Sequence, residues 1–409
     1  MSNLNLKINI FNLFFRILII LIILKLLFSY LSVELHYFQR ELISDYERFN
    51  FFNFNRNFSS KIEFILTPLL LIFIIIYNKY YKQSIYFIIV SALAVSINIF
   101  TAIIHKVSLF DSLSLSLKFF TPIYFFCALI IYSKRQNNDL RSGLLRILLL
   151  CISLSFVAIL FFNPSLNRLN NYLPIYFANI HTNSYIITST LIGFSYLIYR
   201  SQQRLILVLF LTLSVLLIYL GYGVRTATIM FVIFCLPLIY FASDIFKLLI
   251  FKILLCLPFL AAFFFLVKVE FDWTNFSSGR TLMYQQKINQ LRGFNLVDWA
   301  IGKGAGADLI QTDVWWWAKK GAHSDFITVL VENGMIYFAL MILSYLMLLI
   351  LIKRINLIFA ALVFSSFFSS IISNGMAFRP HANYIFYFVL AYIYVDIINN
   401  SKNRELTTT

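Results

Sequence analysis

The sequence predicts an all-α protein, a polytopic transmembrane helical bundle of about twelve spans. Two observations support this fold class. Hydrophobic residues make up 61% of the 409-residue chain and charged residues only 12%, whereas a soluble domain is about half apolar and about a quarter charged. Nearly every apolar run is also long enough to cross a bilayer core of about 30 Å. The whole chain, 1–409, is therefore expected to form a single integral membrane domain.

The expected spans follow from the apolar runs, whose ends are fixed to within a few residues; a count of eleven or thirteen also fits the shorter runs. The first run is too long for the apolar core of a signal peptide, and no small-x-small cleavage site follows it. We expect it to be retained as the first span. The runs are 11–31, 62–77, 84–104, 119–132, 147–162, 174–198, 205–220, 226–241, 248–267, 323–352, 357–372 and 382–398.

The net charge of +16 concerns topology and does not indicate nucleic-acid binding, because no continuous basic face exists outside the apolar runs. Lysines and arginines are densest in the short loops of one side, and such loops face the cytoplasm. This pattern predicts that both chain ends are cytoplasmic. It also predicts that the longest non-apolar segment, 268–322, is an outer loop before the tenth span.

Polar residues that could carry chemistry gather where this outer loop meets the tenth span. His323 and Asp325 begin the span, and Glu332 lies in Glu332-Asn333-Gly334 inside otherwise apolar sequence. A charged residue near a bilayer is costly and suggests a function. His323 is expected in the first helical turn, on one face with Phe326, Ile327 and Leu330, where its imidazole would titrate near neutral pH. The alternative for His323 is a capping or interfacial histidine.

Two further motifs lie within the loop. The sequence Gly302-Lys303-Gly304-Ala305-Gly306 is not a phosphate-binding loop of the G-x-x-x-x-G-K-[ST] type, and we interpret it as a flexible turn with available backbone amides. The triplet 315–317 consists of three tryptophans. It is expected either to lie at the membrane interface or to stack against sugar rings.

Two arginines in short outer turns run against the positive-inside trend. Arg225 lies in Gly223-Val224-Arg225, and Arg379 lies in Arg379-Pro380-His381. Each could extend along the apolar surface towards water. Alternatively, each could bind phosphate with its planar guanidinium, and His381 would accompany Arg379.

Several chemistries find no motif here. The four cysteines lie inside apolar runs and form no C-x-x-C pair, so we interpret them as small buried hydrophobic residues. No zinc motif, nucleophile elbow or D-x-D pair is present, and the histidines and carboxylates lack metal-ligand spacing. Neither a metal nor another cofactor is expected.

One set of residues resembles a known family. Arg280 after Ser278-Gly279, the Gly302-x-Gly304 turn, and His323-Ser-Asp-Phe-x-x-x-Leu330-x-Glu332-x-Gly334 resemble the bacterial O-antigen polymerase and O-antigen ligase superfamily. The turn around Arg225 is similar to that family's Ser-Arg turn, with Val224 in place of serine, and Asn183 resembles a family asparagine. The motif resemblance covers mainly 270–340, whereas the resemblance in topology covers the whole chain.

The resemblance implies metal-independent glycosyl transfer on the periplasmic face of the bacterial inner membrane, with a donor saccharide on undecaprenyl pyrophosphate. Arg225 and Arg280 match pyrophosphate-binding positions, and His323 matches the proposed catalytic histidine. Glu332 would orient the motif or cap backbone groups, and Asp325, Arg379 and His381 are auxiliary candidates. The chemistry fits, because arginines can neutralise the leaving pyrophosphate and a base can take the acceptor's hydroxyl proton.

A polymerase, which joins lipid-linked repeat units, is preferred because the His-Ser-Asp-Phe sequence and the short inner loops resemble polymerases more closely. The alternatives are a ligase that transfers the finished chain to lipid A core, and a polymerase of capsule or exopolysaccharide. A flippase of another class would be expected to line a cavity with charges and to show repeated halves. Expected partners are lipid-linked saccharides, membrane lipids, a chain-length regulator and a flippase, but no nucleic acid.

Overall fold

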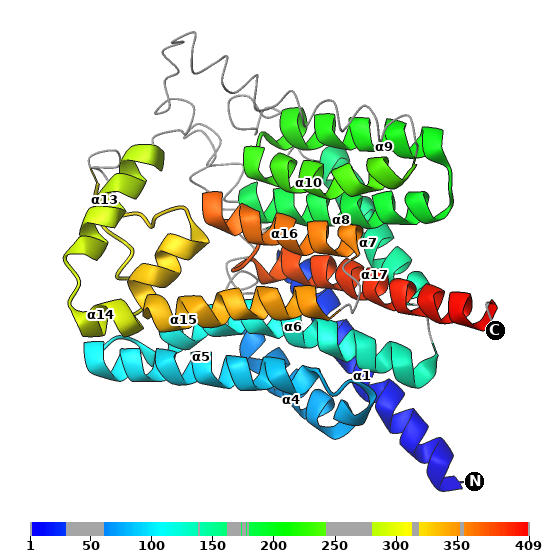
Figure 1. Ribbon diagram of the computed structural model, residues 1–409, viewed down its shortest axis with the longest axis horizontal. Helices are drawn as coiled ribbons and strands as arrows, with labels where there is room; N and C mark the ends of the chain where they lie inside the picture. The colour runs from blue at the N-terminus through cyan, green and yellow to red at the C-terminus, as the bar shows by residue number, and fades with distance from the viewer. Residues whose placement is uncertain are drawn as a thin grey trace.

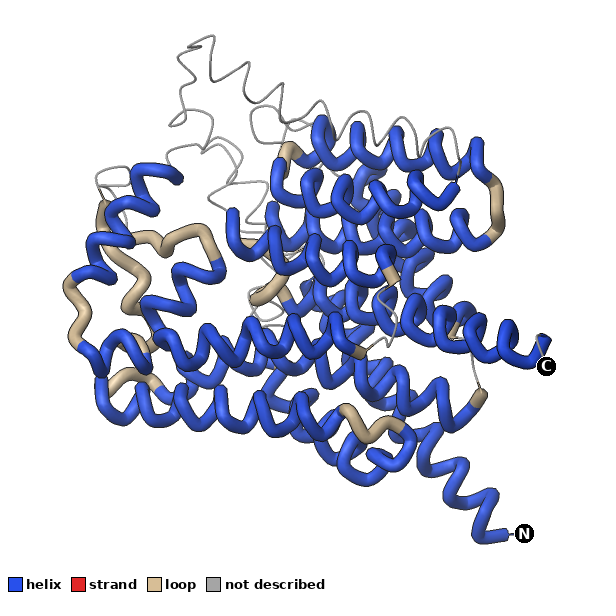
Figure 2. Tube along the Cα trace, viewed as in Figure 1, coloured by secondary structure: helices blue, strands red, loops and turns tan. Residues whose placement is uncertain are grey.

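The computed structural model describes residues 2–29, 61–137, 140–161, 173, 177, 180–242, 280–312, 319–351 and 356–407. These residues are almost all helical, and no strand occurs among them (Figure 2). One isolated antiparallel bridge joins Ile310 to Lys320. The predicted all-α fold class is confirmed for this part of the chain.

The helices run roughly side by side along the long axis (Figure 1). The start of α1 and the end of α17 lie at one end of the bundle, and α13 and α14 lie at the opposite end. We call the end that carries α13 and α14 the loop end. The helices are α1 (Ser2–Ser29), α4 (Glu63–Tyr77), η4 (Asn78–Tyr80), α5 (Ser84–His105), α6 (Leu109–Gln136), α7 (Arg141–Phe161), α8 (Ile180–Arg200), α9 (Arg204–Leu216), the π-helical η6 (Leu217–Tyr222), α10 (Arg225–Ala242), α13 (Arg280–Arg292), α14 (Leu296–Ile301), α15 (Asp325–Ile350), α16 (Leu357–Ile372) and α17 (Pro380–Thr407).

Every predicted apolar run except 248–267 overlaps one of these helices, and that run lies outside the described residues. Eight of the described helices are long and apolar enough to cross a membrane, including α1, α5, α15 and α17. The chain is thus a multi-pass membrane protein by composition and helix length. The total of twelve spans and the side of the membrane that each end faces stay predictions.

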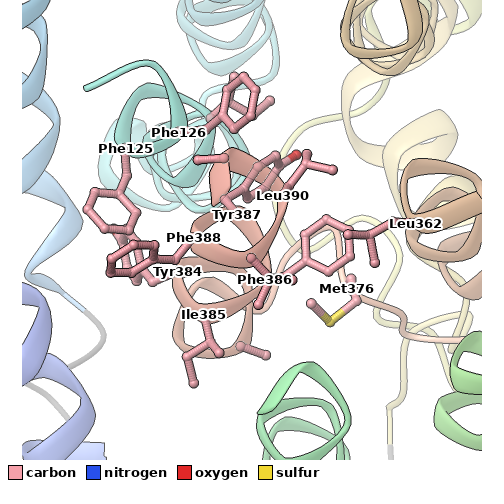
Figure 3. Close-up of a cluster of buried hydrophobic side chains, with 14 of the residues drawn as sticks. Phe125, Phe126, Leu362, Met376, Tyr384, Ile385, Phe386, Tyr387, Phe388 and Leu390 are labelled. Atoms are coloured by element: carbon pink, nitrogen blue, oxygen red, sulfur yellow. The ribbon is translucent and has the colours of Figure 1, made fainter. Parts of the chain in front are cut away.

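Helices α6 and α17 form the centre of the bundle, because most of their residues are buried, whereas most residues of α1, α5 and α9 are not. Aromatic side chains of the two helices interlock: Phe125 meets the rings of Tyr384 and Phe388 edge-on (Figure 3). The outer helices turn large apolar side chains such as Leu205 and Ile103 outwards. This arrangement suits a bundle with a lipid solvent.

The segment 268–322 is folded where the structure describes it. Helices α13 and α14 stand beside the first half of α15 (Figure 1). A small apolar cluster of Leu291, Phe294 and Val331 joins them, separate from the main core. Asn295 caps α14 by accepting from the Asp298 N–H at 2.8 Å. The tryptophan triplet at 315–317 lies outside the described residues.

Candidate functional site

His323 occupies the residue immediately before the N-cap of α15. The Ser324 hydroxyl oxygen accepts from the Ile327 N–H at 3.5 Å and donates to the Ile371 carbonyl at 2.7 Å. His323 itself has a left-handed backbone with φ of 51°, which is uncommon for a residue other than glycine. The prediction that His323 shares a helical face with Phe326 is therefore wrong, because Ser324 is the N-cap and α15 begins at Asp325, two residues after His323.

The turn between α16 and α17, residues 373–379, is where the predicted site residues meet. Arg280 at the start of α13 donates from Nη1 to the Ser373 hydroxyl at 2.9 Å. Arg379 donates from Nε to the Asn374 carbonyl at 3.2 Å. The Asn374 amide nitrogen lies 3.3 Å from His323 Nδ1. Two guanidinium groups and the imidazole thus contact a single short turn.

Asp325 holds this turn against α15. Its carboxylate Oδ2 accepts from the Gly375 N–H at 2.9 Å, and its own N–H donates to the Ser373 carbonyl at 3.2 Å. The side chain is buried, and its charge acts on Arg379. Asp325 therefore fixes the turn's backbone at Ser373 and Gly375, which assigns it a structural task beside the imidazole.

Burial, and after it the positive charges of Arg280, Lys320, Arg379 and Lys287, together lower the pKa of the His323 imidazole to about 4. Both causes act in the same direction, since burial and neighbouring cations each disfavour the protonated ring. The expectation that His323 titrates near neutral pH is corrected by this result. At pH 7 the imidazole is neutral and surrounded by cationic groups.

Tyr284 supports His323 from α13. Its hydroxyl lies 3.3 Å from the His323 carbonyl oxygen and 3.0 Å from the Ile372 carbonyl oxygen, and it donates to these acceptors. Burial raises the pKa of the Tyr284 phenol, so the hydroxyl keeps its proton. Sequence reasoning missed Tyr284, although Arg280, Tyr284 and Lys287 have the spacing of a single helical face.

Arg379 extends from the turn towards α8. Its Nη1 donates to the Thr182 hydroxyl at 3.1 Å, and its guanidinium carbon lies 5.8 Å from the centre of the Tyr185 ring. The Tyr185 hydroxyl donates in turn to Thr226 at 3.0 Å. Arg379 is thus held by polar and aromatic partners, which is different from a side chain that merely extends towards water.

Arg225 is exposed at the start of α10, one residue before Thr226. The path Thr226–Tyr185–Arg379 connects its backbone to the turn at 373–379. Asn183 lies in the same region of α8 and accepts from the Phe177 N–H at 3.2 Å. Arg225 therefore stands at the edge of the site, farther from His323 than Arg280 and Arg379 are along these contacts.

Glu332 is held at a break in α15. Gly334 has φ of 75° and ψ of −177°, and Gly302 at the end of α14 has φ of 77° and the same ψ. This region of backbone space belongs almost only to glycine. A methyl group on Gly334 would stand 2.4 Å from the Gly302 nitrogen, so the two backbones are in direct contact.

The break leaves backbone carbonyl groups of α15 without the hydrogen bonds that they would accept in a continuous helix. Backbone N–H groups of the loop 302–306 donate to these carbonyls instead. Lys303 N–H donates to the Val331 carbonyl at 2.9 Å, and Gly304 N–H donates to the Glu332 carbonyl at 2.8 Å. The Glu332 carboxylate accepts from the Gly306 N–H at 2.9 Å. The interpretation of 302–306 as a flexible turn with available amides is wrong, because α15 occupies these amides.

His381 lies away from the His323 cluster. It is the second residue of α17, and the charges that act on it are those of Lys25 and Lys118. Nearby, Lys25 forms a buried ion pair with Glu63, with 2.7 Å between Nζ and Oε1. This pair is a second polar cluster that the sequence analysis missed, because Lys25 lies inside the apolar run 11–31 and was treated as part of the first span.

The described residues at the loop end supply acid–base and electrostatic groups. No group of three histidine, cysteine or acidic side chains with the spacing of a metal site occurs among the described residues. Cys127, Cys151 and Cys235 are buried and unpaired, as the sequence predicts for them. Comparisons with protein-family models, curated proteins and solved structures found no match.

Proposed function

We propose that the chain is an O-antigen polymerase that joins undecaprenyl-pyrophosphate-linked repeat units on the periplasmic face of the inner membrane. One observation carries this proposal: a neutral imidazole and two guanidinium groups contact the same turn at 373–379. A transfer from a lipid pyrophosphate needs these two kinds of group together, a base for the acceptor and cations for the leaving group.

In the proposed reaction an acceptor hydroxyl oxygen bonds to the anomeric carbon of the donor saccharide. The bond between that carbon and the pyrophosphate oxygen breaks, and the lipid pyrophosphate leaves with the electron pair. His323 takes the hydroxyl proton, for which its neutral form is required. Arg280 and Arg379 offset the charge that grows on the leaving group, and a guanidinium with five N–H donors suits this task.

Asn374 decides which ring nitrogen of His323 can act as the base. A side-chain amide presents its oxygen or its nitrogen to a neighbour, and the two orientations differ only by turning the amide over. With the amide oxygen towards Nδ1–H, the proton stays on Nδ1 and Nε2 accepts the hydroxyl proton. The structure has the amide nitrogen towards Nδ1, so the proposed reaction uses the orientation in which the amide is turned over.

Arg225 is assigned a secondary part in this proposal. Its exposed position at the edge of the site suits recognition of the lipid carrier's phosphates before transfer, whereas Arg280 and Arg379 stand beside the imidazole. Replacing Arg280 by lysine keeps the charge but loses the planar fork, so Arg280→Lys is expected to be poorly active. Full activity of this variant would reduce the role of Arg280 to its charge.

The test is a gel of surface polysaccharide from cells that carry His323→Ala as the only copy. A polymerase defect leaves lipid A core with a single repeat unit, and we expect that product. A ligase defect leaves core without sugar while finished chains stay on the carrier lipid, and a flippase defect leaves neither product outside. Wild-type polymer from His323→Ala would remove this histidine from the mechanism.

A matched control uses His105→Ala. His105 lies at the end of α5 and pairs with Asp298 at 3.6 Å, so its contacts lie outside the turn at 373–379. This variant is expected to give normal polymer, which shows that loss of a histidine at the loop end is not harmful in itself.

The orientation can be tested separately with a single new cysteine. Leu296 at the start of α14 is 89% exposed, and the cysteines of the described residues are buried. A membrane-impermeant maleimide should label Leu296→Cys from the periplasm only. Labelling from the cytoplasmic side would place the site among nucleotides instead of lipid-linked sugars and would overturn the proposal.

A further inference from the structure

The buried Lys287–Asp308 pair gathers several segments around one carboxylate. Lys287 Nζ on α13 lies 2.9 Å from Asp308 Oδ1, and both side chains are almost completely buried. The same ammonium also donates to the backbone carbonyl of Asp308. On the other side, Asp308 Oδ2 accepts from the Ala322 N–H at 2.8 Å and from the Thr328 hydroxyl at 2.7 Å. One carboxylate therefore joins α13, the loop after α14 and the start of α15.

The residues that Asp308 holds stand on both sides of His323. Ala322 precedes it directly, and Thr328 lies in the first turns of α15. The carboxylate also packs against the backbone of Gly321, where an added methyl group would be 2.7 Å from Oδ2. Since the left-handed backbone of His323 is unfavourable for a residue with a β-carbon, contacts of this kind are needed to keep it.

Helix α13 presents one face to the site through residues at i, i+4 and i+7. Arg280 reaches Ser373, Tyr284 reaches the His323 carbonyl, and Lys287 reaches Asp308. These positions share a helical face. The helix therefore contacts the turn at 373–379 and the carbonyl of His323. It also contacts Asp308, which binds the backbone of Ala322 directly before His323.

We propose that Lys287 and Asp308 are positioning residues, which fix the backbone of His323 and thereby hold its imidazole against the turn at 373–379. The inference rests on the proposed function, in which His323 takes the acceptor proton. Neither residue touches the reacting atoms in this proposal. Their effect passes through Ala322 and through the first turns of α15.

Two single substitutions separate positioning from a simple effect of charge. Asp308→Asn leaves an uncompensated cation near His323, whereas Lys287→Met removes a cation. If the pair acted only through charge, these variants would shift the acidic limb of the pH–rate profile in opposite directions and leave the maximal rate unchanged. Under the positioning proposal both variants lower kcat at pH 7, by at least about tenfold, with KM for the lipid-linked donor nearly unchanged.

The measurement uses the full chain, purified and reconstituted in nanodiscs, with a synthetic undecaprenyl-pyrophosphate-linked repeat unit as donor and acceptor. Asp298→Asn is the matched control, because Asp298 is also a buried carboxylate, with Lys303 Nζ and His105 Nε2 each 3.6 Å away. This control should keep the wild-type kcat. The double variant Lys287→Met/Asp308→Asn, which restores charge balance, should stay as slow as the single variants.

A second measurement does not depend on turnover. In protein labelled with nitrogen-15 at histidine, the His323 ring signals are identified by their loss in His323→Gln. We expect Asp308→Asn to broaden or split these signals and Asp298→Asn to leave them sharp. Variants that do not fold are recognised in the same spectra by changes at the other four histidines.

The outcomes distinguish the two proposals. If His323→Ala keeps its activity, the proposed function fails, whereas the ring signals still report whether the pair fixes His323. If His323→Ala is inactive while Asp308→Asn has the kcat and ring signals of the wild type, the positioning proposal fails. Rescue of kcat by the charge-balanced double variant would also overturn it, because charge alone would then explain the effect.

Discussion

Two buried lysine–carboxylate pairs in the described part of the chain have similar geometry but stabilise different parts of the fold. In the bundle, Lys25 of α1 meets Glu63 of α4 at 2.7 Å, and both side chains are buried to within 2%. At the loop end, Lys287 meets Asp308 at 2.9 Å with the same burial. Distance and burial therefore do not separate the two pairs.

The remaining contacts of the two carboxylates do separate them. Glu63 Oε1 also accepts from the Tyr384 hydroxyl at 3.4 Å, and its Oε2 has no hydrogen-bond partner among the residues that the structure describes. Asp308 Oδ2 instead accepts from a backbone N–H and from a hydroxyl group, while Oδ1 forms the ion pair with Lys287. The bundle pair joins helices α1 and α4. In the loop pair, the Asp308 carboxylate is the acceptor for the backbone N–H of Ala322.

The comparison predicts the largest loss of stability when only one partner of the bundle pair is replaced. Lys25→Met leaves the Glu63 carboxylate buried without its countercharge, which should cost about 3–5 kcal/mol of unfolding free energy. The measurement is denaturant unfolding in detergent. Lys25→Met/Glu63→Leu should recover most of the loss, since two apolar side chains replace a buried pair at little cost. A single variant as stable as the parent would contradict the description of this pair.

The loop pair should not be recoverable in the same way. Lys287→Met/Asp308→Leu removes both charges but leaves the Ala322 N–H and the Thr328 hydroxyl without their acceptor. Each unsatisfied buried group costs about 1–3 kcal/mol. We expect this double variant to unfold at a lower denaturant concentration than the parent. Stability equal to that of the recovered bundle variant would remove the distinction between the two pairs.

A change of pH should affect the loop end through His323. Because burial and nearby cations lower its pKa to about 4, the neutral ring persists as pH falls below 7 and is lost only as pH approaches that value. Arg280→Gln removes one cation, so the pKa should rise and the acidic limb should move to higher pH. The pH dependence of kcat in the reconstituted protein measures this shift. Lys25→Met/Glu63→Leu should leave the limb in place.

The smallest effects should come from single hydroxyl groups. Thr328→Val removes a 2.7 Å hydrogen bond to Asp308 and should cost about 1 kcal/mol. Tyr384→Phe removes a contact of 3.4 Å to Glu63, which is longer than a good hydroxyl hydrogen bond, and should cost a few tenths of a kcal/mol. Unfolding of both variants in one detergent provides the test. The reverse order would show that the bundle carboxylate depends on its tyrosine.

The helices were predictable from the sequence because long apolar runs can satisfy their backbone only as helices within a bilayer. His323 and Arg379 were also identifiable, since charged or titratable groups are unusual at such positions, and Arg280 was identified through the family resemblance. Their common contact with 373–379 was not predictable, because this turn carries Asn374 and Ser373, whose types indicate no chemistry by themselves.

Apart from the expected pKa of His323, two predictions failed for local reasons that hydrophobic periodicity does not show. His323 lies outside α15 because Ser324 caps the helix, and a capping serine is hard to distinguish from a helical one. The loop at 302–306 is not flexible, because the carbonyls that hold it come from a break 30 residues later in the chain. The buried Lys25 was missed because a single lysine does not interrupt an apolar run.

The contact between Gly302 and Gly334 has a consequence for how the chain tolerates change. A side chain on Gly302 would stand 2.4 Å from the Glu332 carbonyl and the Asn333 nitrogen, and one on Gly334 would stand 2.4 Å from the Gly302 nitrogen. Neither glycine can therefore be replaced with compensation by its partner. Insertions are usually harmless in a loop between helices, but here an added residue between 302 and 306 would shift the amides away from Val331 and Glu332. This short loop should therefore accumulate substitutions and length changes as slowly as the interior of the bundle does.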